Sequence, residues 1–168
     1  ITNLLPGVFE SGEDPLILVL DGVSDVRNFG AITRTAVCFG ADAVVIPEKG
    51  SARITADAVK ASAGALHTIP VCREKSILRS VEYLKESGLK VVCASERSGR
   101  TISETDMTGP LALVLGSEDK GISRELTNTA DHVVRIPTKG SISSLNVSVA
   151  AGVLIYEISR QRSCSKVK

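Results

Sequence analysis

The sequence predicts one α/β domain in which a mostly parallel sheet carries helices on both faces. Continuous runs of Val, Ile and Leu alternate with helix-like segments along the 168 residues, as expected for strands buried on both sides. Apolar residues make up 43% of the chain and charged residues 23%, the balance of an ordinary globular domain. The length suffices for one sizeable core. No internal repeat divides the chain, so we expect a single domain.

The strands are predicted from apolar runs bounded by turn-forming residues. Residues 1–14, which contain Pro, Gly and acids, are interpreted as a linker or the remnant of an N-terminal extension. The domain is therefore expected over residues 15–168. The six predicted strands cover residues 16–21, 43–47, 67–72, 90–95, 111–116 and 132–137.

The helices are predicted between these strands from the spacing of apolar residues and from capping signals. Asn28 and Ser123 stand where helix N-caps belong, and Gly40 and Gly88 stand where a helix end favours glycine. The predicted helices cover residues 29–40, 54–65, 77–88, 123–130 and 147–158.

The last predicted helix, residues 147–158, is apolar almost all round, so we expect it inside a core. It is too short to span a bilayer, which takes about 20 apolar residues. The segment before it, residues 138–144, is rich in Gly and Ser. Because a polar loop that leads into a buried helix exposes backbone donors, we interpret it as part of a ligand site.

Composition excludes several classes of function. The formal net charge of +1 excludes a strongly cationic nucleic-acid-binding surface, although a local basic surface stays possible. Aromatic residues are 3% of the chain with no Trp, too few for a module that stacks several bases. None of the four cysteines forms a CxxC pair, and no cluster has metal-ligand spacing. We therefore expect a reducing, cytoplasmic setting, no metal and no membrane segment.

A ligand site is predicted after the fifth and sixth strands. The first strand–helix turn, residues 21–30, lacks the G-x-G-x-x-G spacing of dinucleotide-binding folds, and no Walker lysine motif is present. The sequences GSEDKG (116–121) and KGSISSLN (139–146) each follow a strand, at the carboxyl end where open α/β sheets bind ligands. Taken alone, GSEDKG is equally consistent with a helix-entry turn that carries a capping acid.

Three stretches together resemble the motifs of the SpoU family of RNA ribose 2′-O-methyltransferases, in the SPOUT superfamily. They are DVRNFGAITRTAVCFGADAVV (25–45), LALVLGSEDKGIS (111–123) and IPTKGSISSLNVSVAAGVLIYEISRQR (136–162), in the order of the family. The resemblance implies a methyltransferase domain over residues 15–168 whose C-terminal segment forms a deep trefoil knot. It also implies binding of S-adenosylmethionine in the knot and a homodimer whose active site is completed across the interface.

The resemblance also implies the site residues. The methyl donor would contact Gly116, Ile136 and Leu145, with Leu115 and Ser144 close by. The residues that match the catalytic positions of the family are Asn28, Arg34, Glu118, Ser144 and Asn146.

Each catalytic candidate also has a structural interpretation. Methyl transfer to a 2′-hydroxyl needs alignment, help in losing a proton and a place for the RNA phosphate. Arg34 is either a surface arginine or, as we favour, a phosphate clamp and alkoxide stabiliser, since a guanidinium deprotonates with difficulty. Glu118 either orients Arg34 or favours a helix N-terminus. Asn28, Ser144 and Asn146 are each also suited to helix capping.

The nature of the substrate is less sharply indicated. KGSISSLNVSVA and the loop around EKGSARIT favour the family branch that methylates a guanosine of large-subunit ribosomal RNA. A transfer-RNA-directed enzyme and a non-catalytic knotted RNA-binding domain are the alternatives. The presence of Asn28, Arg34, Glu118 and Asn146 favours the enzyme. Basic residues that would meet RNA phosphate, or else form solvated surface charge, are Arg27, Lys49, Arg53, Lys60, Lys120 and Lys139.

Overall fold

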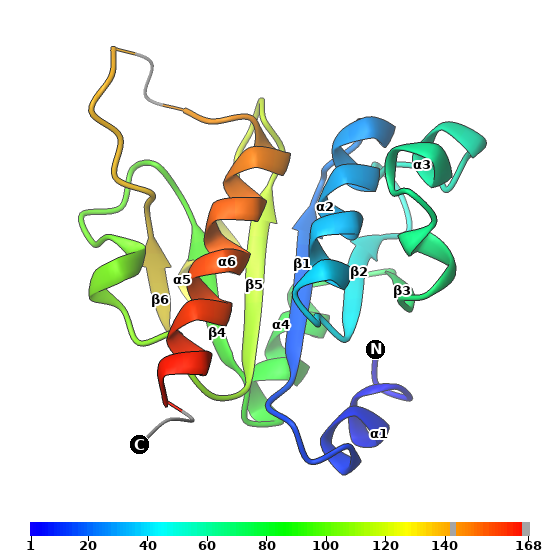
Figure 1. The fold of residues 1–168 in the computed structure, drawn as a ribbon, viewed down its shortest axis with the longest axis horizontal. Helices are drawn as coiled ribbons and strands as arrows, with labels where there is room; N and C mark the ends of the chain where they lie inside the picture. The colour runs from blue at the N-terminus through cyan, green and yellow to red at the C-terminus, as the bar shows by residue number, and fades with distance from the viewer. Residues whose placement is uncertain (142–143, 166–168) are drawn as a thin grey trace.

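A computed structural model describes residues 1–141 and 144–165, in which six parallel strands form one sheet (Figure 1). The spatial order is β3-β2-β1-β5-β4-β6, and every neighbouring pair is parallel. This confirms the predicted α/β class with a parallel sheet. The strands are β1 (Leu16–Asp21), β2 (Ala43–Pro47), β3 (Val71–Glu74), β4 (Lys90–Ala94), β5 (Leu111–Gly116) and β6 (His132–Val134).

Helices cover both faces of the sheet because alternate residues of each strand point to opposite sides. Leu18 belongs to the core beneath α2, α3 and α6, whereas Val19 belongs to the core beneath α1, α4 and α5. The α-helices are α1 (Leu5–Glu10), α2 (Val26–Cys38), α3 (Ala56–Ala61), α4 (Ile77–Glu86), α5 (Arg124–Thr129) and α6 (Val147–Ser165). Two short 3₁₀ helices, η1 (Ala65–His67) and η2 (Ile102–Glu104), lie in the connections.

The helix α2 begins earlier than predicted, and its N-cap is Asp25 rather than Asn28. The Asp25 carboxylate accepts hydrogen bonds from the backbone N–H groups of Arg27 (2.9 Å) and Asn28 (2.8 Å). Asp and Asn are equally good caps, so the local sequence does not discriminate between the two positions. The consequence is that the Asn28 side chain is released from capping. Gly40, with φ of 71°, ends this helix as predicted.

The predicted strand over residues 67–72 is wrong in its start. His67 belongs to η1, and pairing with β2 begins only at Val71, opposite Val44. Pro70 explains the delay, because proline has no N–H to give to a ladder; its carbonyl still accepts from Val44 (3.0 Å). The helix predicted over 54–65 is shortened to α3 because the chain turns left-handed after Ser62, with φ of 49° at Ala63 and 87° at Gly64.

Residues 1–14, predicted as a linker or a remnant of an N-terminal extension, contain α1. Its Leu5 is 1% exposed and packs in the core beneath α4. This segment therefore packs against the domain.

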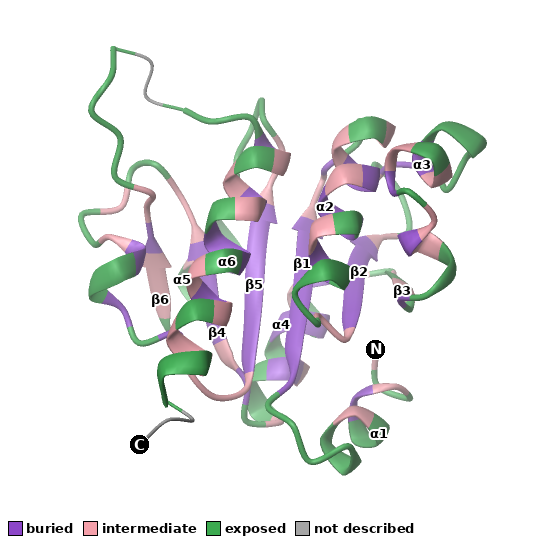
Figure 2. Cartoon of the chain, viewed as in Figure 1, coloured by how far each residue is buried: buried purple, intermediate pink, exposed green. Residues whose placement is uncertain are grey.

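Burial of α6 is one-sided, which corrects the expectation that it lies inside a core (Figure 2). Ala151, Leu154 and Ile155 are buried against the sheet and α2. Val149 and Tyr156, by contrast, are 52% and 56% exposed. A helix that crosses a sheet beside another helix covers the sheet with one face only, however apolar its outer face is. No described helix is both long and apolar enough to cross a membrane.

Candidate active site

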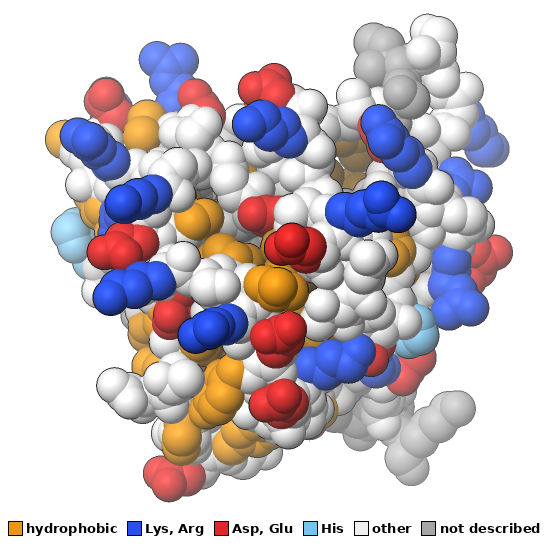
Figure 3. All heavy atoms as spheres, turned by 180° about the vertical axis from the view of Figure 1, so that it is seen from behind, with side chains coloured by type: hydrophobic (Ala, Val, Ile, Leu, Met, Phe, Trp, Pro, Cys, Tyr) orange, Lys and Arg blue, Asp and Glu red, His pale blue; other side chains and the backbone are white. Residues whose placement is uncertain are grey.

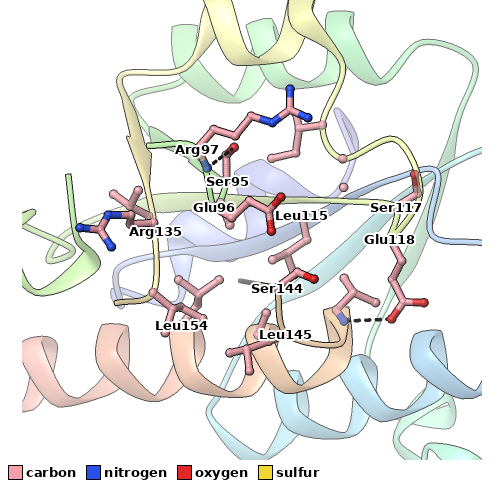
Figure 4. Close-up of a pocket in the computed structure, with 18 of the residues that line it drawn as sticks. Ser95, Glu96, Arg97, Leu115, Ser117, Glu118, Arg135, Ser144, Leu145 and Leu154 are labelled. Carbon is pink, nitrogen blue, oxygen red and sulfur yellow. Dashed lines mark hydrogen bonds between the residues drawn. The ribbon is translucent and has the colours of Figure 1, made fainter. Parts of the chain in front are cut away.

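A cavity of about 300 Å³ lies at the carboxyl edge of the sheet, where β4, β5 and β6 end beside the start of α6 (Figure 4). Strands β5 and β4 are neighbours, and β4 pairs with β6, so the loops that follow all three strands meet here. The lining comes from residues 94–97, 115–122, 134–136, 138, 144–145 and the α6 residues Val147, Ala150 and Leu154.

The residues predicted to contact the methyl donor meet at this cavity. Leu115, Gly116, Ile136, Ser144 and Leu145 all line it. They come from the end of β5, from the segment after β6 and from the entry to α6, which lie far apart in the sequence. Within the polar loop predicted as part of the ligand site, Ile142 and Ser143 lie outside the described residues.

Gly116 shapes one wall of the cavity through a close backbone approach. A Cβ placed on Gly116 would collide with the backbone of Gly121 and Ile122. The turn between them is closed by hydrogen bonds from the Gly121 N–H to the Ser117 carbonyl (2.8 Å) and from the Lys120 N–H to Ser117 Oγ (3.2 Å). The turn can fold back onto the strand end only because residue 116 has no side chain.

Asn146 joins the three sequence motifs through hydrogen bonds. Its Nδ2 donates to Asn28 Oδ1 (3.0 Å) on α2 and to Glu118 Oε1 (2.7 Å) in the loop after β5. Its Oδ1 accepts from the N–H of Ser148 (2.9 Å), which caps α6. Glu118 Oε1 also accepts from the N–H of Val147 (3.3 Å). Three of the predicted catalytic residues thus form one polar cluster beside the cavity.

Arg34 stands apart from this cluster. It is exposed on α2 and does not line the cavity. It lies six positions after Asn28, a rotation of about 600° at 100° per residue, which leaves the two side chains about 120° apart around the helix. The expected bond between Glu118 and Arg34 is absent among the described residues, since Glu118 bonds to Asn146 and Val147 instead. Within one chain, the predicted catalytic residues are therefore not all brought together.

Sequence reasoning missed the part of the cavity wall that follows β4. Ser95, Glu96 and Arg97 line the cavity, as does Ile122 just beyond the GSEDKG sequence. The signal for the first three was present, because residues 90–95 were predicted as a strand whose carboxyl end belongs at the ligand edge of the sheet. The sequence does not indicate that this strand, β4, lies between β5 and β6 in the sheet.

The lining combines apolar and charged groups, which suits a ligand that is apolar in one part and zwitterionic in another. Leu115, Ile136 and Leu154 supply apolar surface. Both Glu96 and Arg97 supply charge, and Glu118, Asp119, Lys120 and Arg135 add further groups of both signs. An S-adenosyl amino acid has these properties, and the volume falls within the range of small-molecule pockets.

Neither a metal nor a cysteine nucleophile is indicated around this cavity. Among residues 1–141 and 144–165, no group of three or more His, Cys, Asp or Glu side chains is arranged to hold a metal ion. All four cysteines are free thiols. Burial raises the pKa of the Cys93 thiol in β4 to about 12, so this thiol stays protonated at neutral pH.

The fold and the cavity define an α/β protein with a parallel sheet and a ligand site at the carboxyl ends of its strands. Residues 15–156 match the SpoU rRNA Methylase family, and the chain belongs to that family.

Relatives with curated names agree with this assignment. The chain is 41% identical over 160 residues to the 23S rRNA (guanosine-2′-O-)-methyltransferase RlmB of Yersinia pestis, an alignment that covers 95% of this chain and 65% of the relative. It is 44% identical over 160 residues to an uncharacterized tRNA/rRNA methyltransferase of Mycobacterium sp. (strain KMS), covering 95% and 51%. The chain thus spans about half to two thirds of the length of these curated relatives.

Solved structures with the same fold include members that bind the expected donor. The SpoU methyltransferase AviRb from Streptomyces viridochromogenes, in complex with AdoMet, matches with a TM-score of 0.80 and 31% identity over 89% of this chain and 58% of that one. The TrmH/SpoU tRNA modifying enzyme of A. aeolicus matches with a TM-score of 0.83 and 30% identity, covering 92% and 78%.

Proposed function

We propose that this chain catalyses the S-adenosylmethionine-dependent methylation of a ribose 2′-hydroxyl in RNA. The observation that carries the proposal is the polar cluster of Asn28, Glu118 and Asn146, which ties the three family motifs together beside the cavity. The AdoMet complex of AviRb supports the choice of donor.

The proposed substrate is a guanosine of 23S ribosomal RNA. The name of the Yersinia pestis relative supports it. Transfer RNA is the second candidate, because the A. aeolicus protein of the same fold is a tRNA modifying enzyme. For either RNA, the exposed residues Lys49, Arg53 and Lys120 are candidates for phosphate contacts. Figure 3 shows acidic and basic side chains alternating over the opposite, α4-bearing side, which makes that side less suited to RNA.

The donor would be held by Leu115, Ile136 and Leu145 against its adenosyl part, with the backbone at Gly116 allowing close approach. When bound, the donor would supply its sulfonium methyl group: the methyl–sulfur bond breaks as the bond to the 2′-oxygen forms, S-adenosylhomocysteine leaves, and the 2′-hydroxyl proton passes to solvent. The protein's part is to align the hydroxyl and to exclude competing water from the cavity. Glu118 and Asn146 act by fixing the entry to α6.

Arg34 is proposed to act in the partner subunit's site. It lies away from the cavity of its own chain, and it is exposed on α2 next to an apolar outer face of α2 and α6. From there its guanidinium would clamp the RNA phosphate and stabilise the developing alkoxide charge. Acting as a proton acceptor is its secondary role, since guanidinium groups deprotonate with difficulty.

The homodimer is proposed on the same apolar outer face. Its members, all 36% or more exposed, are Val37, Phe39, Val149, Val153 and Tyr156. Phe39 and Tyr156 stack edge to face with ring centroids 6.1 Å apart, which joins the two helices into one continuous surface. An apolar surface of this kind is suited to a second copy of the chain.

The C-terminal segment is proposed to form the deep trefoil knot that the family resemblance implies. In support, the start of α6 lines the same cavity as the loops after β4 and β5, so the C-terminal segment meets two loops that precede it in the chain. A cytoplasmic location, which suits a ribosomal RNA substrate and free thiols, completes the proposal.

The test has two parts. Calorimetry with the purified protein should show binding of S-adenosylmethionine and S-adenosylhomocysteine; failure of both to bind would remove the enzyme from consideration. Ribose-methylation mapping of ribosomal and transfer RNA in a deletion strain should then reveal one lost 2′-O-methylguanosine in 23S RNA. A lost site in transfer RNA would select the second substrate, and donor-independent RNA binding without any lost site would select the non-catalytic alternative.

A further inference from the structure

Glu96 is a charged residue of the cavity wall that the proposed mechanism does not use. It follows β4 directly, is exposed, and lines the cavity. In Figure 4 its carboxylate points into the cavity toward Leu115, on the wall that faces the start of α6. A carboxylate in this position presents a negative charge to whatever the cavity holds.

The backbone around Glu96 is held in place on both sides. The Ser95 N–H donates to the Val134 carbonyl (2.9 Å), and Ser98 Oγ donates to the Val133 carbonyl (2.6 Å). The Ser98 N–H also donates to the Ser95 carbonyl (3.1 Å), which closes a turn around Glu96. Because the turn is pinned to β6, the direction of this side chain is set by the sheet.

Glu96 differs from Glu118, the acid whose contacts are already explained. Glu118 is engaged by Asn146 and by the N–H of Val147. In the part of the chain that the structure describes, Glu96 takes part in none of the four ion pairs and in no side-chain hydrogen bond. Figure 4 shows the guanidinium groups of Arg97 and Arg135 directed away from it.

We propose that Glu96 is the charge partner of a cationic group of the bound methyl donor, either its sulfonium or its α-ammonium. The inference rests on the proposed function, which makes an S-adenosyl compound the ligand. Within a partly enclosed cavity, water is a poorer competitor for the cation than it is at an open surface, so the attraction is strengthened. Leu115 and Leu154 supply apolar contacts for the uncharged adenosyl part of the donor.

The test compares three ligands by calorimetry. S-adenosylmethionine carries both cationic groups, S-adenosylhomocysteine carries only the α-ammonium, and 5′-methylthioadenosine carries neither. Glu96→Gln removes the charge but keeps the shape of the side chain. We expect about tenfold weaker binding of S-adenosylmethionine, because its cationic group loses a charge partner, and 5′-methylthioadenosine binding within about twofold of wild type.

The pattern of loss assigns the group. Loss for S-adenosylmethionine alone assigns the sulfonium, and loss for S-adenosylmethionine and S-adenosylhomocysteine together assigns the α-ammonium. Glu96→Lys should enlarge the same loss by adding repulsion. Glu82→Gln, the same charge change on the exposed side of α4, is the matched control and should bind all three ligands as wild type does.

Two outcomes overturn the proposal: unchanged binding of all three ligands by Glu96→Gln, or an equal loss for all three. Thermal unfolding without ligand checks that the variant folds as wild type does. The outcomes also distinguish a failure of the proposed function from a failure of the proposed role of Glu96. Wild-type protein that binds none of the ligands removes the proposed function, whereas normal wild-type binding with an unaffected variant removes only the role of Glu96.

Discussion

At the scale of single residues, the oxygen and the nitrogen of the Asn146 side-chain amide have different structural roles. Its Oδ1 accepts from the first turn of α6, which is the work of an N-cap. Its Nδ2 bridges Asn28 and Glu118, which belong to two other segments. The sequence-based question of whether Asn146 is a cap or a functional residue therefore has the answer that it is both a cap and a connector.

Substitution of Asn146 by Ser separates the capping of α6 from the bridge between Asn28 and Glu118. Serine caps a helix as well as asparagine does, so Asn146→Ser should keep the free energy of unfolding within about 0.5 kcal/mol of wild type. It cannot bridge Asn28 and Glu118, so methyl transfer should fall by about tenfold or more. Asn146→Ala should lose about 1 kcal/mol of stability as well. Urea unfolding and initial rates measure both effects. Full activity of Asn146→Ser would show that the bridge is dispensable.

Arg34 is predicted to serve the reaction without serving donor binding. Because it is exposed and lies outside the cavity, Arg34→Ala should bind S-adenosylmethionine within about twofold of wild type, while transfer is abolished. Single-turnover transfer of a labelled methyl group and calorimetry check the two halves. Arg79→Ala, an exposed arginine of α4, is the control. A fully active Arg34→Ala would place Arg34 outside the active site.

At the scale of secondary-structure elements, the end of β5 and the turn after it depend on one close approach. The turn from Ser117 to Gly121 folds back onto the strand at Gly116, where any side chain would meet the backbone. The same turn places Glu118 where it reaches the N-terminus of α6. The end of β5, the turn and the start of α6 therefore form one structural unit. A substitution at residue 116 should alter both the cavity wall and the polar cluster of Asn28, Glu118 and Asn146.

We predict that Gly116→Ala damages both stability and donor binding. The added Cβ forces the turn to move, and strain of this kind costs about 1–3 kcal/mol of unfolding free energy. Binding of S-adenosylhomocysteine should weaken by at least about tenfold, because the moved turn forms one wall of the cavity. Gly99→Ala is the matched control, since a Cβ there meets no atom within 4 Å. Equal effects of the two substitutions on unfolding and calorimetry would refute the close-approach argument.

At the scale of the whole molecule, the outer face of α2 and α6 and the position of Arg34 point to the same arrangement. The face is apolar and exposed, whereas the inner face of both helices is already buried against the sheet. Arg34 lies on the same helix as part of this face but outside the cavity of its own chain. A second copy seated there would both cover the apolar surface and bring an arginine toward a site.

The proposed dimer makes two measurable predictions. Light scattering at micromolar concentration should give twice the mass of the chain, and Val153→Lys, which places a charge in the apolar face, should give a monomer. Mixing Arg34→Ala with the impaired variant Asn146→Ala should give more activity than either variant alone, because a mixed dimer holds one site with both residues intact. A wild-type monomer, or no recovery on mixing, would contradict a shared active site.

The sequence by itself determined the local structure of the sheet and the family. Fully buried parallel strands appear in the sequence as continuous apolar runs, so four of the six predicted strands overlap closely with β1, β2, β4 and β5. The strand predicted over residues 132–137 begins with β6 but runs three residues beyond it. The three motifs identified the family that the comparison over residues 15–156 confirms. The helix predicted over residues 29–40 corresponds to α2, but its start and cap were placed three residues too late, since Asp25 and Asn28 are chemically equivalent choices.

Only the tertiary structure decided which strand ends meet. The strands β1, β2, β4 and β5 are apolar runs of the same kind, so periodicity carries no information on the order β3-β2-β1-β5-β4-β6. That order places β4 between β5 and β6, and thereby brings Glu96 into the cavity. It also lays α6 beside α2, which leaves the outer side of an almost wholly apolar helix exposed. Local composition determines what a segment becomes, whereas long-range pairing determines what it faces.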